Sequence, residues 1–252
     1  MHSADLLTRI GELRRAGLTA PQIARELGLT KAQVQPLLRQ VAGSHRALAA
    51  EQPLPGPAER ELVGCWINPG WSAGLTLADA PDWAATDPEG AADPGTGGLA
   101  AVLVARAERA SRVTLCGFLV DVYCLGVKDT LGPQTVSSSA VRGRCERFFG
   151  GFPDPPRTAP LELAQHLVHG AVAYAASLGF SPHEEFADVE PFLGTAPAPC
   201  PIQFGRNGTP WYISGPYDDP RQVITTLERT VGAGHFHYLM GAPVPRPARR
   251  HS

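Results

Sequence analysis

Reactive side-chain types gather at the end of an apolar, β-branched run. Residues 112–122 predict a buried strand, and Asp121 and Cys124 lie at its end. Polar groups at the end of a core strand are held by a rigid scaffold, as catalysis requires. The first hypothesis is a nucleophilic site in which Cys124 attacks and Asp121 orients the base. The base would be His169 or His183.

A metal site is the second hypothesis. Histidines three apart on a helix, or two apart on a strand, point to the same side and can share one ion. The candidates are His166 with His169 and His235 with His237, completed by Asp121 or His183. Because neither an HExxH motif nor a zinc-finger spacing occurs, the sequence assigns no metal ligand and no cofactor.

A third hypothesis is a nuclease-like carboxylate cluster, since acidic side chains can hold the divalent ions that hydrolyse phosphodiesters. Its members would be Asp121, Asp129 and Glu162, with Lys128 beside them. All three hypotheses place the chemistry in the larger, C-terminal part of the chain.

The elements that would position these side chains indicate an α+β fold with antiparallel hairpins. Residues 100–107 and 112–122 predict a hairpin, and 160–178 predict a helix with one apolar stripe. Three local signals place further elements. They are a capping box at 181–184, a hairpin turn at Asn207-Gly208 within 204–213, and Asp219 capping a last helix that begins at Pro220.

Glycine and proline, 27 and 25 of the 252 residues, divide the chain. The predicted parts are a helical domain at 1–46, a proline-rich linker at 47–60, an α+β domain at 61–240 and a disordered basic tail at 241–252. Residues 68–98 are rich in Gly, Pro, Ala and Asp and predict a long surface excursion.

The helical domain contains three short amphipathic segments. Leu6, Leu7, Ile10 and Leu13 have helical spacing, Thr19 can cap a second helix, and Thr30 a third. Gly28 permits the tight turn between the second and third helices. Pro36 lies inside the third helix and predicts a kink, because it removes a backbone hydrogen bond.

These features resemble the helix-turn-helix module of bacterial DNA-binding proteins, over residues of about 4–42. The resemblance is carried by Ile23 and Ala24 at the helix crossing, Leu27-Gly28-Leu29 in the turn, and Val34 and Leu37 on the last helix. The remainder of the chain resembles an uncharacterised bacterial protein family, to which no activity is attached.

The resemblance implies that the third helix enters the major groove. Lys31, Gln33 and Gln35 would then reach base edges. Phosphate contacts would come from arginines, namely Arg14, Arg15, Arg25 and Arg39. A homodimer is expected, because such modules bind paired half-sites.

Charge follows the same division. Residues 1–46 hold seven basic and three acidic residues, whereas the whole chain has a net charge of −2. A basic module on an acidic body favours DNA or RNA as the partner of that module alone. Five scattered cysteines without a CxxC pair, and no apolar run of membrane-spanning length, predict a cytoplasmic protein with no membrane partner.

The leading hypothesis is therefore a bacterial DNA-binding regulator, whose α+β domain dimerises, senses a ligand or recruits a partner. The alternative is an enzyme, a Cys/His hydrolase or a metal-dependent nuclease or hydrolase, which the small module targets to nucleic acid or the ribosome.

Overall fold

The computed structural model describes residues 3–15, 20–30, 32–41, 55–78, 83, 87 and 97–240. The chain divides into two compact units, a smaller one at Met1–Leu54 and a larger one at Pro55–Ser252. The linker residues 47–54 and the tail 241–252 lie outside the described residues.

The smaller unit contains the three predicted helices. They are α1 (Ser3–Arg15), α2 (Ala20–Glu26) and a third helix at residues 32–41, which continues through Pro36. Apolar side chains from all three helices form one core. Its buried members are Ile10, Leu13, Ile23, Ala24 and Val34.

The larger unit is built on a five-stranded antiparallel sheet in the order β5-β4-β3-β1-β6, so the predicted α+β class is confirmed. The strands are β1 (Leu62–Ile67), β3 (Leu99–Ala107), β4 (Arg112–Asp121), β5 (Gly126–Ser137) and β6 (Arg157–Thr158). The predicted hairpin is the pair β3–β4, whose register runs from Leu99 opposite Asp121 to Ala107 opposite Val113.

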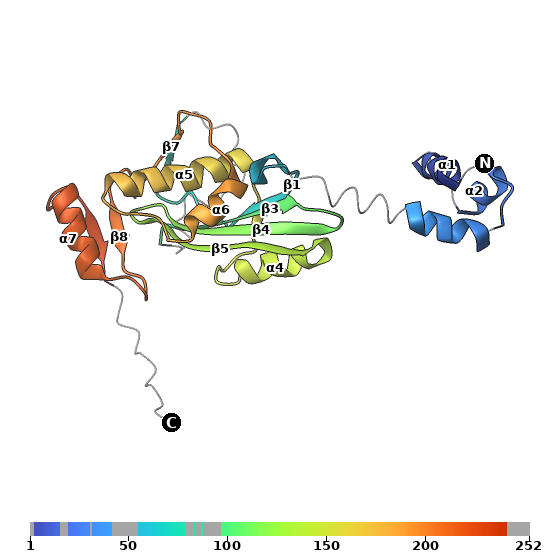
Figure 1. The fold of residues 1–252 in the computed structure, drawn as a ribbon. Helices are drawn as coiled ribbons and strands as arrows, with labels where there is room; N and C mark the ends of the chain where they lie inside the picture. The colour runs from blue at the N-terminus through green and yellow to red at the C-terminus, as the bar shows by residue number, and fades with distance from the viewer. Residues whose placement is uncertain are drawn as a thin grey trace, which may run out of the picture. The chain divides into compact units, whose positions relative to one another are not determined.

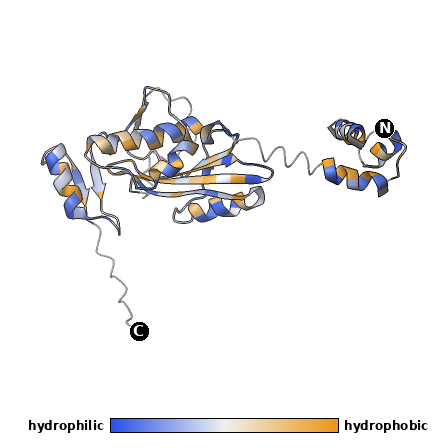
Figure 2. Cartoon of the chain, viewed as in Figure 1, coloured by the Kyte–Doolittle hydropathy of each residue, from blue (hydrophilic) through white to orange (hydrophobic). Residues whose placement is uncertain are grey.

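Helices cover both faces of this sheet because its central strands are apolar on both faces. Alternate residues of β3 face opposite sides, Val102 and Val104 toward one core and Leu103 and Ala105 toward another. The first core is covered by α5 (Leu161–Ser177) and α6 (Phe186–Leu193), and the second by α4 (Val141–Phe148). Figure 1 shows α4 on the opposite side of the sheet from α5 and α6, and Figure 2 shows hydrophobic residues along the central strands.

The C-terminal segment forms a separate two-stranded parallel sheet. Its elements are β8 (Trp211–Ile213), α7 (Pro220–Thr230) and β9 (His237–Leu239). Asp219 caps α7, as predicted, and its side chain accepts hydrogen bonds from the amides of Arg221 and Gln222. Figure 1 shows α7 and β8 at one end of the five-stranded sheet.

The hairpin predicted over residues 204–213 is wrong in its pairing. The turn itself exists, with Asn207 and Gly208 at positive φ and a bridge between Arg206 and Thr209. The strands on either side of the turn do not pair with each other, however. β7 (Ile202–Gln203) pairs with β2 (Thr76–Leu77), and β8 pairs with β9. Contacts distant in sequence therefore override the local hairpin signal.

The surface excursion predicted at 68–98 is also wrong for its first part. Asn68 is fully buried and accepts a hydrogen bond from the Ala101 amide at 2.6 Å. The Asp87 carboxylate is buried as well, and it accepts hydrogen bonds from the amides of Gly70 and Ser72. Trp71 enters the core. The hydrogen bonds of the Asn68 and Asp87 side chains let an irregular segment lie inside the larger unit.

Two boundaries differ from the predictions. The end of the predicted linker belongs to the larger unit, where the short 3₁₀ turn η1 (Pro57–Glu59) contacts α6 and Arg60 pairs with Glu108. The capping box at 181–184 does not start a helix, because α6 begins only at Phe186. A second 3₁₀ turn, η4 (Ser138–Ala140), leads into α4.

Within the described residues, the helices are too short or too polar to span a bilayer.

The close contact between Gly98 and Tyr123 gives a stability prediction. Gly98 has a φ of +80°, and a side chain there would overlap the buried Tyr123 ring. We expect Gly98→Ala to lower the free energy of unfolding by about 1–3 kcal/mol. The matched control is Gly143→Ala on α4, where the added methyl group meets open space and stabilises by about 0.5–1 kcal/mol. Urea unfolding of both variants checks the pair, and an equal effect of the two substitutions would contradict the packing described.

Candidate functional site

The third helix of the smaller unit begins with a capping box. The Gln33 side-chain oxygen accepts hydrogen bonds from the Thr30 amide and hydroxyl, both at 2.9 Å, and the Gln33 amide donates to the Thr30 hydroxyl at 3.3 Å. A bidentate contact with adenine needs that same Gln33 oxygen as its acceptor. In this structure the Gln33 side chain caps the helix with the oxygen atom that the expected base contact would use.

The other predicted nucleic-acid contacts fall into two groups. Arg25, at the end of α2, is exposed, and so are Gln35 and Arg39 on the third helix. The Lys31 side chain and those of Arg14 and Arg15 lie outside the described residues. Of these predicted contacts, the described surface thus presents one amide side chain, Gln35, and two guanidinium groups, Arg25 and Arg39.

In the larger unit, Asp121 closes the turn between β4 and β5. Its carboxylate accepts hydrogen bonds from the amides of Tyr123 and Cys124, at 2.9 and 3.0 Å. Burial raises the pKa of Asp121 to about 6, although the positive charge of Lys128 and the backbone hydrogen bonds act in the opposite direction. Asp121 therefore orders the turn, which accounts for a carboxylate at the end of an apolar strand.

Cys124 lies in the same turn but is fully buried in an apolar cluster with Leu178, Tyr212 and Leu227. Burial raises the pKa of its thiol, and the negative charge of Asp121 raises it further. Since the thiolate is the nucleophile, this environment suppresses the reactivity that the first hypothesis requires.

The two histidines of that hypothesis make other contacts. On α5, His169 Nε2 lies 2.6 Å from the Gly194 carbonyl oxygen and Nδ1 lies 3.7 Å from Glu190. Of these two histidines, His183 alone reaches the neighbourhood of the β4–β5 turn, where its amide donates to the Val127 carbonyl. In the described part of the chain, neither His169 nor His183 hydrogen-bonds to Cys124 or Asp121.

The metal and carboxylate hypotheses gain no geometric support. In the described segments, no three His, Cys, Asp or Glu side chains gather closely enough to hold an ion. His166 is buried against Trp83, and its Nε2 lies 3.8 Å from Glu162 on the preceding turn. His237, in β9, packs its ring on that of Trp211 in β8. Asp129 is exposed on β5, whereas Asp121 is buried in the turn.

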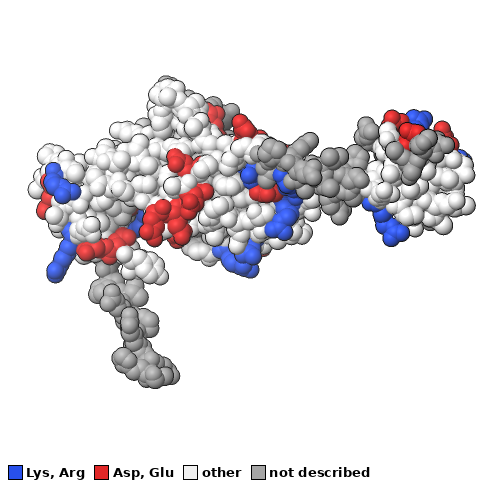
Figure 3. Space-filling view, in the orientation of Figure 1, with Lys and Arg blue, Asp and Glu red and all other residues white. Residues whose placement is uncertain are grey.

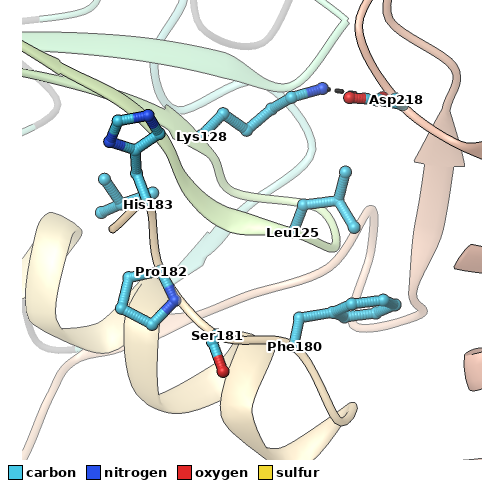
Figure 4. A pocket seen from close by; sticks show the side chains of 8 residues that line it. Leu125, Lys128, Phe180, Ser181, Pro182, His183 and Asp218 are labelled. Atoms are coloured by element: carbon cyan, nitrogen blue, oxygen red, sulfur yellow. Dashed lines mark hydrogen bonds and ion pairs between the residues drawn. The ribbon is translucent and has the colours of Figure 1, made fainter. Parts of the chain in front are cut away.

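A small pocket opens beside the β4–β5 turn, with a volume of about 240 Å³. The ammonium group of Lys128 crosses to Asp218 and lies 2.9 Å from its Oδ2 atom. Figure 4 shows this ion pair, with His183 beside the Lys128 stem and Phe180 on the lower wall. Three segments thus meet here, the start of β5, the connection between α5 and α6, and the loop that precedes α7.

Asp218 is the residue of this site that the sequence analysis missed. Its Oδ2 atom also accepts hydrogen bonds from the Gly215 amide at 2.8 Å and from the Tyr212 hydroxyl at 3.4 Å. Its neighbour Asp219 gave a clear capping signal. An ion pair ninety positions away from Lys128 leaves no local pattern, so no sequence signal distinguished Asp218 from a loop carboxylate.

Charge on the larger unit is mixed. Figure 3 shows acidic side chains gathered near the middle of its visible face and basic ones over α4. The exposed acidic residues include Glu184 and Glu185, between α5 and α6, and Asp188 in the first turn of α6. The described residues on this visible face do not form one continuous positive patch of the kind that holds a nucleic-acid backbone.

The capping box yields a prediction for the smaller unit. Gln33→Ala removes the acceptor of the Thr30 amide, so the free energy of opening the third helix should fall by about 1 kcal/mol. Gln35→Ala, on the same exposed helix, should change it by less than about 0.5 kcal/mol. Amide hydrogen exchange over residues 32–41 measures both, and equal protection in the two variants would argue against the box.

The raised pKa of Asp121 yields a pH-dependent prediction. Its folded pKa of about 6 exceeds the ordinary value of 3.8, so the native state binds the proton more tightly than the unfolded chain. The stabilisation by Asp121 is then present at low pH and is lost as the pH rises through about 6. An asparagine side chain at this position would stay neutral and could still accept the turn's hydrogen bonds.

We therefore expect the stability of Asp121→Asn, relative to the wild type, to increase by about 2 kcal/mol between pH 4 and pH 7. Urea unfolding across this range measures the difference, with Asp129→Asn on the exposed side of β5 as the control. A difference that does not vary with pH would contradict the burial of Asp121.

Comparisons with known proteins add no identity to this geometry. The chain matches no protein-family model, no curated protein and no solved structure.

Proposed function

We propose that the chain is a nucleic-acid-binding protein, a bacterial regulator whose smaller unit binds DNA. The observation that supports the proposal most is the arrangement of the second and third helices. Residues 27–31 connect them, Gly28 takes a φ of +65° in this turn, and the small side chain of Ala24 is buried in the same core as Val34. A short turn and a small residue allow two helices to cross closely.

The exposed side of this arrangement has suitable chemistry. Gln35 lies one position after buried Val34, so it projects from the third helix while the helix stays anchored. Its free amide can pair with adenine in the major groove. Arg25 and Arg39 can contact phosphates, which increases affinity without reading sequence. Lys31 keeps the role that the sequence analysis gives it.

A homodimer is part of the proposal. One module of this size offers few base contacts, and two copies on paired half-sites raise the affinity by raising the effective concentration of the second. Of the roles considered for the larger unit, its pocket favours ligand sensing. The enzyme alternative has no comparable support, because the Cys124 thiol is buried and, among the described residues, neither His169 nor His183 hydrogen-bonds to it.

The test uses the full chain and fluorescence anisotropy of duplex DNA selected from a randomised pool. Gln35→Ala and Lys31→Ala should reduce the preference for the selected duplex over an unrelated one by about 5- to 100-fold, the value of one base contact. Arg25→Gln and Arg39→Gln should instead weaken both duplexes equally. Each should also reduce the slope of log affinity against log salt by about 0.9.

Arg221→Gln, on α7 of the larger unit, is the matched control and should change neither quantity. No salt-dependent binding to any duplex would overturn the DNA proposal. Stronger binding of the same pool as RNA would move the target to RNA. If the Gln35 and Arg39 variants lost the same affinity for every duplex sequence, the third helix would not read bases.

A further inference from the structure

The pocket beside the β4–β5 turn combines apolar walls with a small number of polar groups. Leu125, Val127, Phe180 and Pro182 form the walls, and Lys128, Ser181, His183 and Asp218 supply the polar atoms. Ligand sites are commonly built in this way, with apolar lining for affinity and a few donors for orientation. The volume of about 240 Å³ limits the occupant to a small molecule.

Two of the polar side chains, Lys128 and His183, can offer hydrogen-bond donors to a ligand. Lys128 carries three N–H groups and uses one of them on Asp218. His183 Nδ1 accepts from the Glu185 amide at 3.3 Å, so in the neutral ring the proton is on Nε2. Figure 4 places the His183 ring and the Lys128 side chain on the same side of the pocket. In Figure 4 the Lys128 ammonium points to Asp218 and away from His183, so an acceptor meets both donors only after the Lys128 side chain turns.

The ion pair restricts the charge of this acceptor. The side chains of Lys128 and Asp218 are 19% and 11% exposed, so the ammonium is largely removed from water. Its single positive charge is already shared with one carboxylate and cannot neutralise a dianion such as a phosphate monoester. Asp218 keeps two other donors, Gly215 and Tyr212, so it remains hydrogen-bonded if Lys128 turns toward a ligand.

We infer that this pocket binds a small monocarboxylate with an apolar body. The carboxylate accepts hydrogen bonds from Lys128 Nζ and His183 Nε2, and the body packs on Leu125, Phe180 and Pro182. The inference deepens the ligand-sensing role within the proposed function. Its test requires no nucleic acid, so failure of DNA binding and failure of this site are observed separately.

The probes are phenylacetate and 4-methylpentanoate, titrated into the full chain by calorimetry, with the corresponding neutral amides as controls. The acids should bind with saturation at millimolar concentration. Each amide should bind at least about tenfold more weakly than its acid, because a hydrogen bond to a charged group is lost. Amide NMR shifts should change at residues 125–128 and 180–183.

Two variants assign the contacts. Lys128→Met keeps the apolar stem and should weaken acid binding about tenfold or more. His183→Phe keeps a ring without donors and should weaken it several-fold, while the Lys128–Asp218 pair stays intact. This second variant preserves the test if Lys128→Met does not fold, and Arg221→Met is the control with unchanged binding.

Three results would overturn the inference. They are amides that bind as tightly as the acids, acid binding unaffected by Lys128→Met and His183→Phe, and no saturable binding of either acid.

Discussion

The larger unit depends on burying the β3–β4 hairpin on both faces. Val102 and Val104 point to one core and Leu103 and Ala105 to the other, and each fully buried aliphatic side chain contributes about 1.5–3 kcal/mol. A sheet with two apolar faces is stable only when both are covered. The placement of α4 on one side, and of α5 and α6 on the other, follows from this requirement.

The same burial explains the turn that borders the pocket. Because β4 is apolar up to its last residues, the chain must reverse while it is still inside the unit. Asp121 provides acceptors for the turn amides, and Gly126, at a φ of +70°, comes within contact distance of Ala171 and Ala175 on α5. Lys128 then leaves the turn on the side where Asp218 approaches. A structural demand at the strand end thus creates a polar site at the edge of the core.

Local signals predicted the elements whose stability is local. The apolar stripe of α5, the apolar runs of β3 and β4, and the cap at Asp219 each lie within a few turns or one hairpin, and all three are present. Predictions were wrong where distant residues decide the outcome. The Asp87 carboxylate holds the segment around Gly70 inside the larger unit by hydrogen bonding. The strand β8 pairs with β9 and not with the segment before the Asn207-Gly208 turn, as the predicted hairpin required.

The candidate site shows the same division. Asp121, Lys128 and His183 were recognised by type, and they do lie around one turn and its pocket. Cys124 and His169 were grouped with them by type alone, and burial and the Gly194 carbonyl separate them from this chemistry. In the smaller unit, Gln33 was expected to read bases, but the helix start needs its side chain for capping. A residue's type does not reveal which demand its side chain meets.

We propose that the smaller unit contacts DNA and that the larger unit does not. This proposal is tested most directly by amide NMR of the full chain, titrated with a duplex selected for binding. We expect the amide shifts to change mainly at residues 20–41 and to stay the same in the β3–β4 hairpin. Changes confined to the larger unit, or none at saturating duplex, would contradict it.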